Sequence, residues 1–207
     1  MSRVAVADLG LGNLGSVQKA IVRAGGEPLL ARRAEEIARA ERVIVPGVAA
    51  FGLGMERASA LGLRDALRAA LARGTPVLGI CLGMQILFEE GEEDGLRRGL
   101  GLLPGRVTRI PEGVQVPHIG WQKLGWTSDS PLAQAGRKPL WAYFANSYRC
   151  EAPAELTQAV ADHSGVSIAA VVGRETLFGV QFHPEKSARD GEDLLARFLR
   201  LPRGARA

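Results

Sequence analysis

Cys81 lies in a segment whose residue types and spacing suit acyl-transfer chemistry. It stands between two glycines in the run Gly-Ile-Cys-Leu-Gly, directly after an apolar stretch that predicts a buried strand. A sharp strand-to-helix turn would expose the sulfur, and flanking glycines would avoid collisions with the strand and the helix. The positive end of the helix dipole would favour the reactive thiolate. This pattern predicts a cysteine nucleophile, although a lone cysteine in an apolar strand is commonly a small core residue.

His183 and Glu185 supply a base and a carboxylate for such a nucleophile. They occur in the run Phe-His-Pro-Glu at the end of a predicted strand, where residues two apart point to the same side. Pro184 stiffens the backbone between them. A carboxylate beside one ring nitrogen fixes the tautomer, so that the other nitrogen can accept the thiol proton. Together with Cys81, these residues predict a catalytic triad.

The remaining histidines and the second cysteine fit this chemistry less well. His163 lies in a polar Asp-His-Ser-Gly turn and is expected to be solvated. His118, in Val-Pro-His-Ile-Gly-Trp, could line a site edge or a subunit contact, and a structural role fits equally well. Neither has a second His or Cys at ligand spacing, so no metal site and no cofactor are expected. Cys150 follows a predicted strand and is expected to be dispensable.

The composition favours one globular domain covering residues 1–207. A hydrophobic content of 46% is enough for one core. The net charge is +4, but the 26 basic and 22 acidic residues are interspersed, so a nucleic-acid partner is not expected. No apolar run approaches the roughly 18 residues of a membrane-spanning helix. Only two cysteines and an N-terminus that opens into a predicted strand favour a reducing cytoplasm.

The order of predicted elements favours an α/β fold. In the first half, strands alternate with helices, which is typical of a parallel sheet covered by helices on both faces. The predicted strands of this half are residues 3–7, 28–31, 43–45 and 76–80, and the predicted helices are residues 14–24, with Asn13 as the cap, and 63–73.

The second half changes in character. A helix is expected at residues 84–90 after the nucleophile, and a closing helix at 192–199. Between them, strand-like runs follow one another with short glycine-containing turns, which predicts antiparallel strands added to the central sheet. These runs are residues 114–122, 140–144, 167–172 and 177–182.

These motifs closely resemble those of class I glutamine amidotransferases, whose triad has the chain order Cys, His, Glu. In α/β-hydrolases the order is Ser, Asp, His instead. Further stretches covering nearly the whole chain resemble the glutaminase subunits of imidazole glycerol phosphate synthase in particular. These stretches are residues 8–14, 46–52, 81–85 running on to Glu92 and Glu93, 117–121, 143–148 and 179–187. The resemblance implies a flavodoxin-like amidotransferase domain.

The resemblance also implies a substrate, L-glutamine, and a role for each site residue. Cys81 would attack the carboxamide to form a γ-glutamyl thioester, His183 would pass the proton to the leaving ammonia, and water would then release glutamate. The oxyanion would be bound by backbone N–H groups of Leu82 and of the Gly47 and Val48 region, and one such donor is typically worth ~10² to 10³ in rate. The positions that hold the amino-acid end of glutamine in the family are Gln85, Glu93, Ser147 and Tyr148.

A partner chain is expected to use the ammonia, because the sequence continues only briefly after Glu185. In the family this partner is a (β/α)8-barrel cyclase. It converts a phosphorylated ribulosyl-formimino carboxamide ribotide into imidazole glycerol phosphate and an aminoimidazole carboxamide ribotide, in histidine biosynthesis. Ammonia in neutral water is mostly protonated and non-nucleophilic. A protected passage from a docked Cys81 face is therefore expected, together with activation by the cyclase.

Two positions depart from the family pattern. Ala49 replaces a usual glycine in the oxyanion loop, and if that position needs a positive φ, alanine costs on the order of 1 kcal/mol. Asn146 stands where the family often has histidine.

Three other interpretations stay open. A glutaminase serving pyridoxal phosphate synthesis typically has Gly-Gly-Glu-Ser where this chain has Pro-Gly-Val-Ala. A catalytically silent scaffold is disfavoured by the complete triad. A cysteine peptidase or other amidase on the same fold is disfavoured by Gln85 and Glu93, which suit free glutamine better than a peptide.

Overall fold

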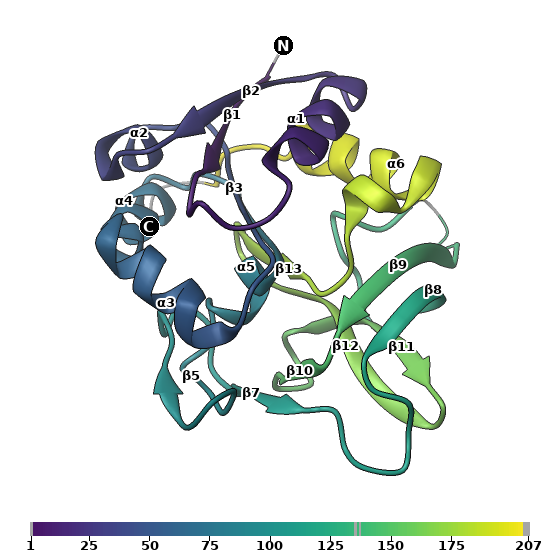
Figure 1. The fold of residues 1–207 in the computed structure, drawn as a ribbon. Helices are drawn as coiled ribbons and strands as arrows, with labels where there is room; N and C mark the ends of the chain where they lie inside the picture. Colours follow the sequence, from purple (N-terminus) through teal and green to yellow (C-terminus); the bar gives the residue numbers. More distant parts are fainter. Residues whose placement is uncertain (1, 135, 137, 205–207) are drawn as a thin grey trace.

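A computed structural model describes residues 2–134, 136 and 138–204. Its main feature is a nine-stranded sheet (Figure 1). The sheet contains β1 (Ser2–Ala7), β2 (Gly26–Ala31), β3 (Val43–Gly47), β4 (Val77–Cys81), β8 (His118–Trp126), β9 (Leu140–Asn146), β11 (Thr157–His163), β12 (Val166–Arg174) and β13 (Leu177–Val180). Their order across the sheet is β2-β1-β3-β4-β13-β12-β11-β8-β9.

The sheet has a parallel part and an antiparallel part. Neighbouring strands from β2 to β13 are parallel, and every pairing from β13 to β9 is antiparallel. The predicted α/β class, a parallel sheet extended by antiparallel strands, is confirmed. One detail was wrong, because the run at residues 177–182 was expected to be an added antiparallel strand. β13 is antiparallel to β12 but parallel to β4, so it joins the two parts.

Helices cover both faces of the sheet, as the strand pattern requires. In Figure 1, α1 (Leu14–Arg23) and α6 (Ala188–Arg200) lie on one side, while α2 (Ala34–Ala38), α3 (Phe51–Ala60) and α4 (Leu63–Ala72) lie on the other. Val4 and Val6 of β1 belong to the core cluster that contains side chains of α1 and α6. Ala5 and Ala7 belong to the cluster that contains side chains of α3 and α4. Because successive strand residues point to opposite faces, β1 is buried on both.

A second, smaller sheet lies beside this layer structure. It contains β5 (Glu90–Gly91), β6 (Arg97–Arg98), β7 (Arg106–Arg109) and β10 (Tyr148–Glu151), in the order β10-β7-β5-β6. β7 pairs with both β5 and β10. The small sheet therefore connects the segment that follows the predicted nucleophile to the segment that follows β9.

The predicted helices at residues 14–24, 63–73 and 192–199 correspond to α1, α4 and α6, and the Asn13 side chain caps α1 by accepting the Ser16 N–H. The helix predicted at residues 84–90 was wrong. α5 (Leu82–Gln85) has only four residues. The carbonyl oxygens of residues 86–88 accept N–H groups from residues 100–103 instead of continuing the helix, and Glu90 already belongs to β5.

His118 is buried at the start of β8 and should make the fold sensitive to acid. Its ring stacks on Phe144 and on His163, at 4.5 and 4.1 Å between ring centroids. Burial, with a smaller contribution from the charge of His163, lowers the pKa of His118 to about 4. In the unfolded chain the same ring takes up a proton near its ordinary pKa of about 6.5. Below that pH, protonation therefore favours unfolding, until the folded state is also protonated near pH 4.

We expect the free energy of unfolding to fall between about pH 6.5 and about pH 4, with His118 accounting for up to about 3 kcal/mol of the loss. His118→Phe keeps an aromatic ring in the stack and removes the titration, so its stability should decline less over this range. Urea unfolding at neutral and mildly acidic pH measures both proteins. An equal decline in the two would show that other groups cause the acid sensitivity.

Candidate active site

Cys81 ends the parallel strand β4 in a strained backbone conformation. Its φ is 53° and its ψ is −110°, outside the favoured backbone regions for a residue that has a Cβ atom. A Cβ on Gly79 would lie 2.5 Å from the carbonyl oxygen of Gly83, and one on Gly83 would lie 1.7 Å from that of Val45. The glycines thus permit α5 to pass close to β3 and β4. The elbow geometry that the sequence predicted is present.

His183 reaches the elbow because β13 lies directly beside β4. Val180 is opposite Ile80 in the parallel register, so the chain that leaves β13 emerges next to Cys81. The backbone N–H of His183 donates to the Tyr143 carbonyl oxygen at 2.9 Å, which ties this segment to β9. The imidazole is almost fully buried, and Cys81 is close enough to be among the groups that raise its pKa.

Glu185 orients His183, but through a geometry that the sequence did not predict. The two residues were expected to share an extended segment. His183 is extended, whereas Glu185 belongs to a short 3-10 turn, η2 (Pro184–Lys186). The turn still brings the Oε1 atom of Glu185 to 2.8 Å from Nδ1 of His183, and both side chains are buried. With Nδ1 bonded to the carboxylate, Nε2 is the ring nitrogen available to the sulfur.

The surroundings of His183 favour its protonated form. Burial alone lowers the pKa of this imidazole, but hydrogen bonds with Cys81 and Glu185 and the charges of both partners raise it to about 10. At neutral pH the ring therefore holds its proton, with Glu185 bonded to Nδ1. An imidazolium beside a cysteine sulfur is the arrangement that cysteine nucleophiles use to stabilise a thiolate.

A buried polar network extends from the sulfur to the predicted substrate-binding residues. Gln181 is fully buried, and its Nε2 lies 3.8 Å from Sγ of Cys81. Its Oε1 lies 3.3 Å from Nε2 of Gln85, which also donates to the carbonyl oxygen of Tyr148 at 3.3 Å. Gln85 and Tyr148 are thereby brought together. Sequence reasoning missed Gln181, although a glutamine inside the apolar run at residues 177–182 was an available signal.

The other predicted substrate residues lie at neighbouring positions. Glu93 follows β5, and its carboxylate accepts the N–H of Phe51 at the start of α3, at 2.6 Å. Ser147 connects β9 to β10, and its carbonyl oxygen accepts the N–H of Ile110. Asn146, the departure from the family pattern, donates from Nδ2 to the Tyr148 carbonyl oxygen at 3.0 Å. This asparagine therefore supports the same carbonyl group that Gln85 contacts.

Two of the predicted oxyanion residues, Gly47 and Leu82, are neighbours of Cys81. Gly47, the last residue of β3, is opposite Cys81 in the register, and the Val48 side chain is exposed. Leu82 begins α5, and its side chain packs against Gly47. Ala49 is not among the residues with positive φ, so alanine at this position carries no left-handed strain in this conformation.

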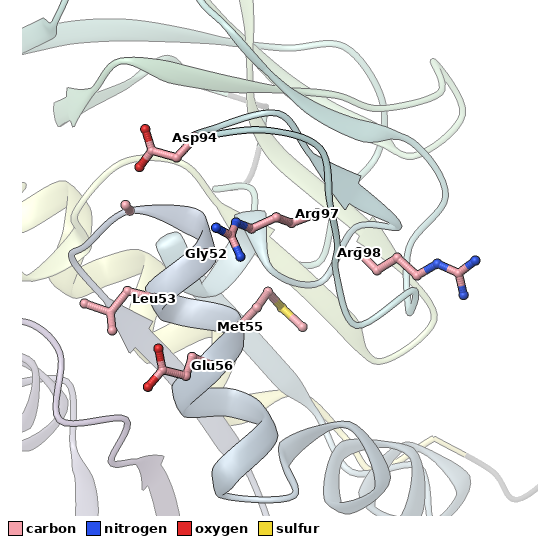
Figure 2. A pocket seen from close by; sticks show the side chains of 8 residues that line it. Gly52, Leu53, Met55, Glu56, Asp94, Arg97 and Arg98 are labelled. Atoms are coloured by element: carbon pink, nitrogen blue, oxygen red, sulfur yellow. The ribbon is translucent and has the colours of Figure 1, made fainter.

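A cavity of about 620 Å³ lies beside the start of α3 (Figure 2). In the figure, Arg97 reaches toward Gly52, whereas Arg98 points away. A Cβ on Gly52 would lie 2.8 Å from Nε of Arg97, so glycine leaves room for the guanidinium. The lining of the cavity contains no triad residue and consists of Ala50, Gly52, Leu53, Met55, Glu56, Asp94, Arg97 and Arg98.

Comparison with known proteins identifies the family. The model of the family described as "Glutamine amidotransferase class-I" matches residues 10–201, a range that contains Cys81, His183 and Glu185. This chain belongs to the class-I glutamine amidotransferases. The family expected from the motifs is thereby confirmed.

Curated relatives of this amidotransferase resemble it over nearly its full length. A protein of Symbiobacterium thermophilum named imidazole glycerol phosphate synthase subunit HisH is 45% identical over 201 residues, covering 97% of this chain and 95% of the relative. A protein of the same name from Geobacillus thermodenitrificans is 43% identical over 210 residues, covering 99% and 98%.

Solved structures support the amidotransferase fold. The structure described as PurLQS from Thermotoga maritima matches with a TM-score of 0.76 at 22% identity, covering 96% of this chain and 98% of that chain. A structure described as glutamine amidotransferase matches with a TM-score of 0.73 at 23% identity, covering 95% and 96%. At such identities the likeness concerns the fold alone.

Two further observations concern the described part of the chain. Within it, no group of three or more His, Cys, Asp or Glu side chains could hold a metal ion. None of its helices has the length and apolar character needed to cross a membrane.

Replacing Gly83 by alanine should displace the elbow, because the new methyl group would overlap the Val45 carbonyl oxygen. We expect Gly83→Ala to lower the free energy of unfolding by at least about 3 kcal/mol and to slow alkylation of Cys81. Gly125→Ala is the matched control, since a Cβ at Gly125 of β8 meets nothing within 4 Å. Urea unfolding and thiol labelling check both variants. If the two behave alike, the close approach does not constrain the turn.

Proposed function

We propose that this chain is the glutaminase subunit of an imidazole glycerol phosphate synthase. It hydrolyses L-glutamine to glutamate and ammonia and delivers the ammonia to a separate cyclase subunit. The HisH names of the relatives support the pathway. The observation that carries the chemistry is the buried His183–Glu185 pair, 2.8 Å apart, beside a cysteine on a strained turn.

In the proposed first step, the sulfur of Cys81 attacks the side-chain carboxamide carbon of glutamine. His183 holds the thiol proton on Nε2, and Glu185 stabilises the resulting imidazolium through Nδ1. The carboxamide oxygen becomes an oxyanion. The N–H of Leu82 and an N–H from the Gly47 and Val48 region stabilise it, since Leu82 directly follows Cys81 and Gly47 is opposite Cys81 in the register.

In the proposed second step, the tetrahedral intermediate breaks its C–N bond. His183 donates its proton to the leaving nitrogen, so that ammonia departs and a γ-glutamyl thioester remains on Cys81. Water then attacks the thioester, with His183 accepting a proton from it and returning one to the sulfur. Glutamate leaves and the thiol is restored. No metal and no cofactor take part.

Four residues are proposed to bind the amino-acid end of glutamine. Gln85 and Tyr148 belong to the network beside the sulfur, and Ser147 immediately precedes Tyr148. Glu93, whose carboxylate accepts the N–H of Phe51, supplies a charge suited to the substrate ammonium group. A site built for both ends of one free amino acid favours glutamine over a peptide substrate.

The proposed partner is a (β/α)8-barrel cyclase, and an exposed apolar surface suits its docking. Ile119 and Trp121 of β8 and Trp141 of β9 are all exposed. Trp121 contacts Tyr143 edge-on, with 6.1 Å between ring centroids, and the Tyr143 carbonyl oxygen binds the backbone of His183. A partner seated on these side chains would therefore act on the segment that carries the base. We also propose a cytoplasmic location, where both cysteines remain free thiols.

The triad makes a direct prediction. We expect Cys81→Ala to abolish glutamate release and His183→Gln to abolish labelling of Cys81 by a glutamine-like electrophile, because the sulfur loses its proton acceptor. Cys150→Ser, the matched control, should retain most activity. Glutamate assay and peptide mass mapping measure these outcomes. If Cys150→Ser inactivates the protein as completely as Cys81→Ala, the assignment of Cys81 as the nucleophile is contradicted. Unchanged labelling of Cys81 in His183→Gln would exclude His183 as the base.

Addition of the cyclase and its ribotide ligand should accelerate glutamine hydrolysis. If docking completes the oxyanion site, the gain of one donor corresponds to about 10² to 10³ in kcat. Ile119→Ala should weaken association, and Val22→Ala, an exposed apolar residue on α1, serves as its control. Glutamate release by the isolated and mixed subunits tests this. Equal rates would exclude gating by the partner.

A further inference from the structure

Gln181 is a buried polar residue in direct contact with the proposed nucleophile. It lies between β13 and His183, its side chain is 0% exposed, and its Nε2 is 3.8 Å from Sγ of Cys81. The triad mechanism gives it no task. A buried amide has both a donor end and an acceptor end to satisfy. The end that faces the sulfur therefore decides what this side chain can do.

The neighbours of Gln181 fix the orientation of its amide. The Tyr148 carbonyl oxygen can only accept, so the atom that Gln85 presents to it at 3.3 Å must be the amide nitrogen. That same nitrogen of Gln85 lies 3.3 Å from Gln181. Because two amide nitrogens cannot bond to each other, Gln181 must present its oxygen to Gln85. Its nitrogen is thereby left facing Cys81.

Cys150 supports the same orientation. Its Sγ lies 4.0 Å from Oε1 of Gln181. Burial, with a smaller contribution from Cys81, raises the pKa of the Cys150 thiol well above its ordinary value, so the group keeps its proton and acts as an S–H donor. Two donors, from Gln85 and Cys150, thus converge on the Gln181 oxygen.

We propose that Gln181 is a further catalytic residue, which stabilises the Cys81 thiolate by donating an amide N–H to its sulfur. The anion is the stronger acceptor, so this donor stabilises the thiolate more than the thiol. The thiol proton still passes to His183, and no bond to Gln181 forms or breaks. The proposal rests on the proposed function, because it takes Cys81 as the nucleophile.

The test is the pH dependence of Cys81 alkylation by iodoacetamide in the isolated chain, followed by peptide mass mapping. Gln181→Met keeps the side-chain length and removes the donor. We expect the alkylation rate at neutral pH to fall about tenfold and the midpoint of the profile to move up by about one pH unit. A residue that only fills space would leave the midpoint unchanged, and that result would overturn the proposal.

Two further variants provide a matched control and a second test of the amide donor. Gln158→Met makes the same substitution at another buried glutamine, on β11, which bonds to Ser130, and it should leave the Cys81 profile unchanged. Gln181→Glu preserves the shape but places an oxygen opposite the sulfur, so its midpoint should also move up. If Gln181→Met does not fold, Gln181→Glu tests the proposal in its place. An unshifted midpoint in Gln181→Glu, or an equal shift in Gln158→Met, would contradict the proposal.

Glutamine hydrolysis separates this proposal from the proposed function. If Cys81→Ala releases glutamate at the wild-type rate, both the proposed function of this chain and the proposed role of Gln181 are contradicted. Hydrolysis that requires Cys81, combined with an unshifted profile in both Gln181 variants, would remove only the role of Gln181.

Discussion

The position of the nucleophile depends on one close approach between backbones. α5 begins immediately after Cys81 and passes so near to β3 that a Cβ on Gly83 would overlap the Val45 carbonyl oxygen. Along this path Cys81 has a φ of 53°, a conformation that costs an ordinary residue about 1–2 kcal/mol. The register of β3 and β4 puts Gly47 opposite Cys81. Strain at the nucleophile and the nearness of the oxyanion loop thus have one origin.

Around this turn, buried polar groups satisfy one another. Buried polar atoms are costly unless they find partners, and here the partners are other members of the site. His183 is held by Glu185 and by the backbone of Tyr143, while Gln85 is held by the Tyr148 carbonyl. These contacts join β13, β9, β10 and α5. The triad is therefore buried where strands meet, whereas Val48 in the neighbouring loop is exposed.

The sequence predicted the elements whose apolar pattern is dictated by burial, and it predicted the triad. β1 and β4 are buried on both faces and read as apolar runs, and α1 carries its cap at Asn13. α3 was not predicted, because Gly52 and Gly54 interrupt its pattern, although Gly54 is needed beside Leu82. The expected helix at residues 84–90 was wrong because distant residues compete for its carbonyl oxygens. Gln181 could not be placed, since its contact with Cys81 depends on the pairing of β13 with β4.

β13 lies between β4 and β12, with one parallel and one antiparallel neighbour. It is the last strand in chain order among the described residues, yet it occupies the middle of the sheet. During synthesis, the strands on either side emerge from the ribosome before the strand that must fit between them. Cys81 is therefore synthesised well before His183, and the two side chains come together only when β13 pairs with β4 and β12. A nascent chain therefore cannot bring His183 beside Cys81 until β13 has been inserted between β4 and β12.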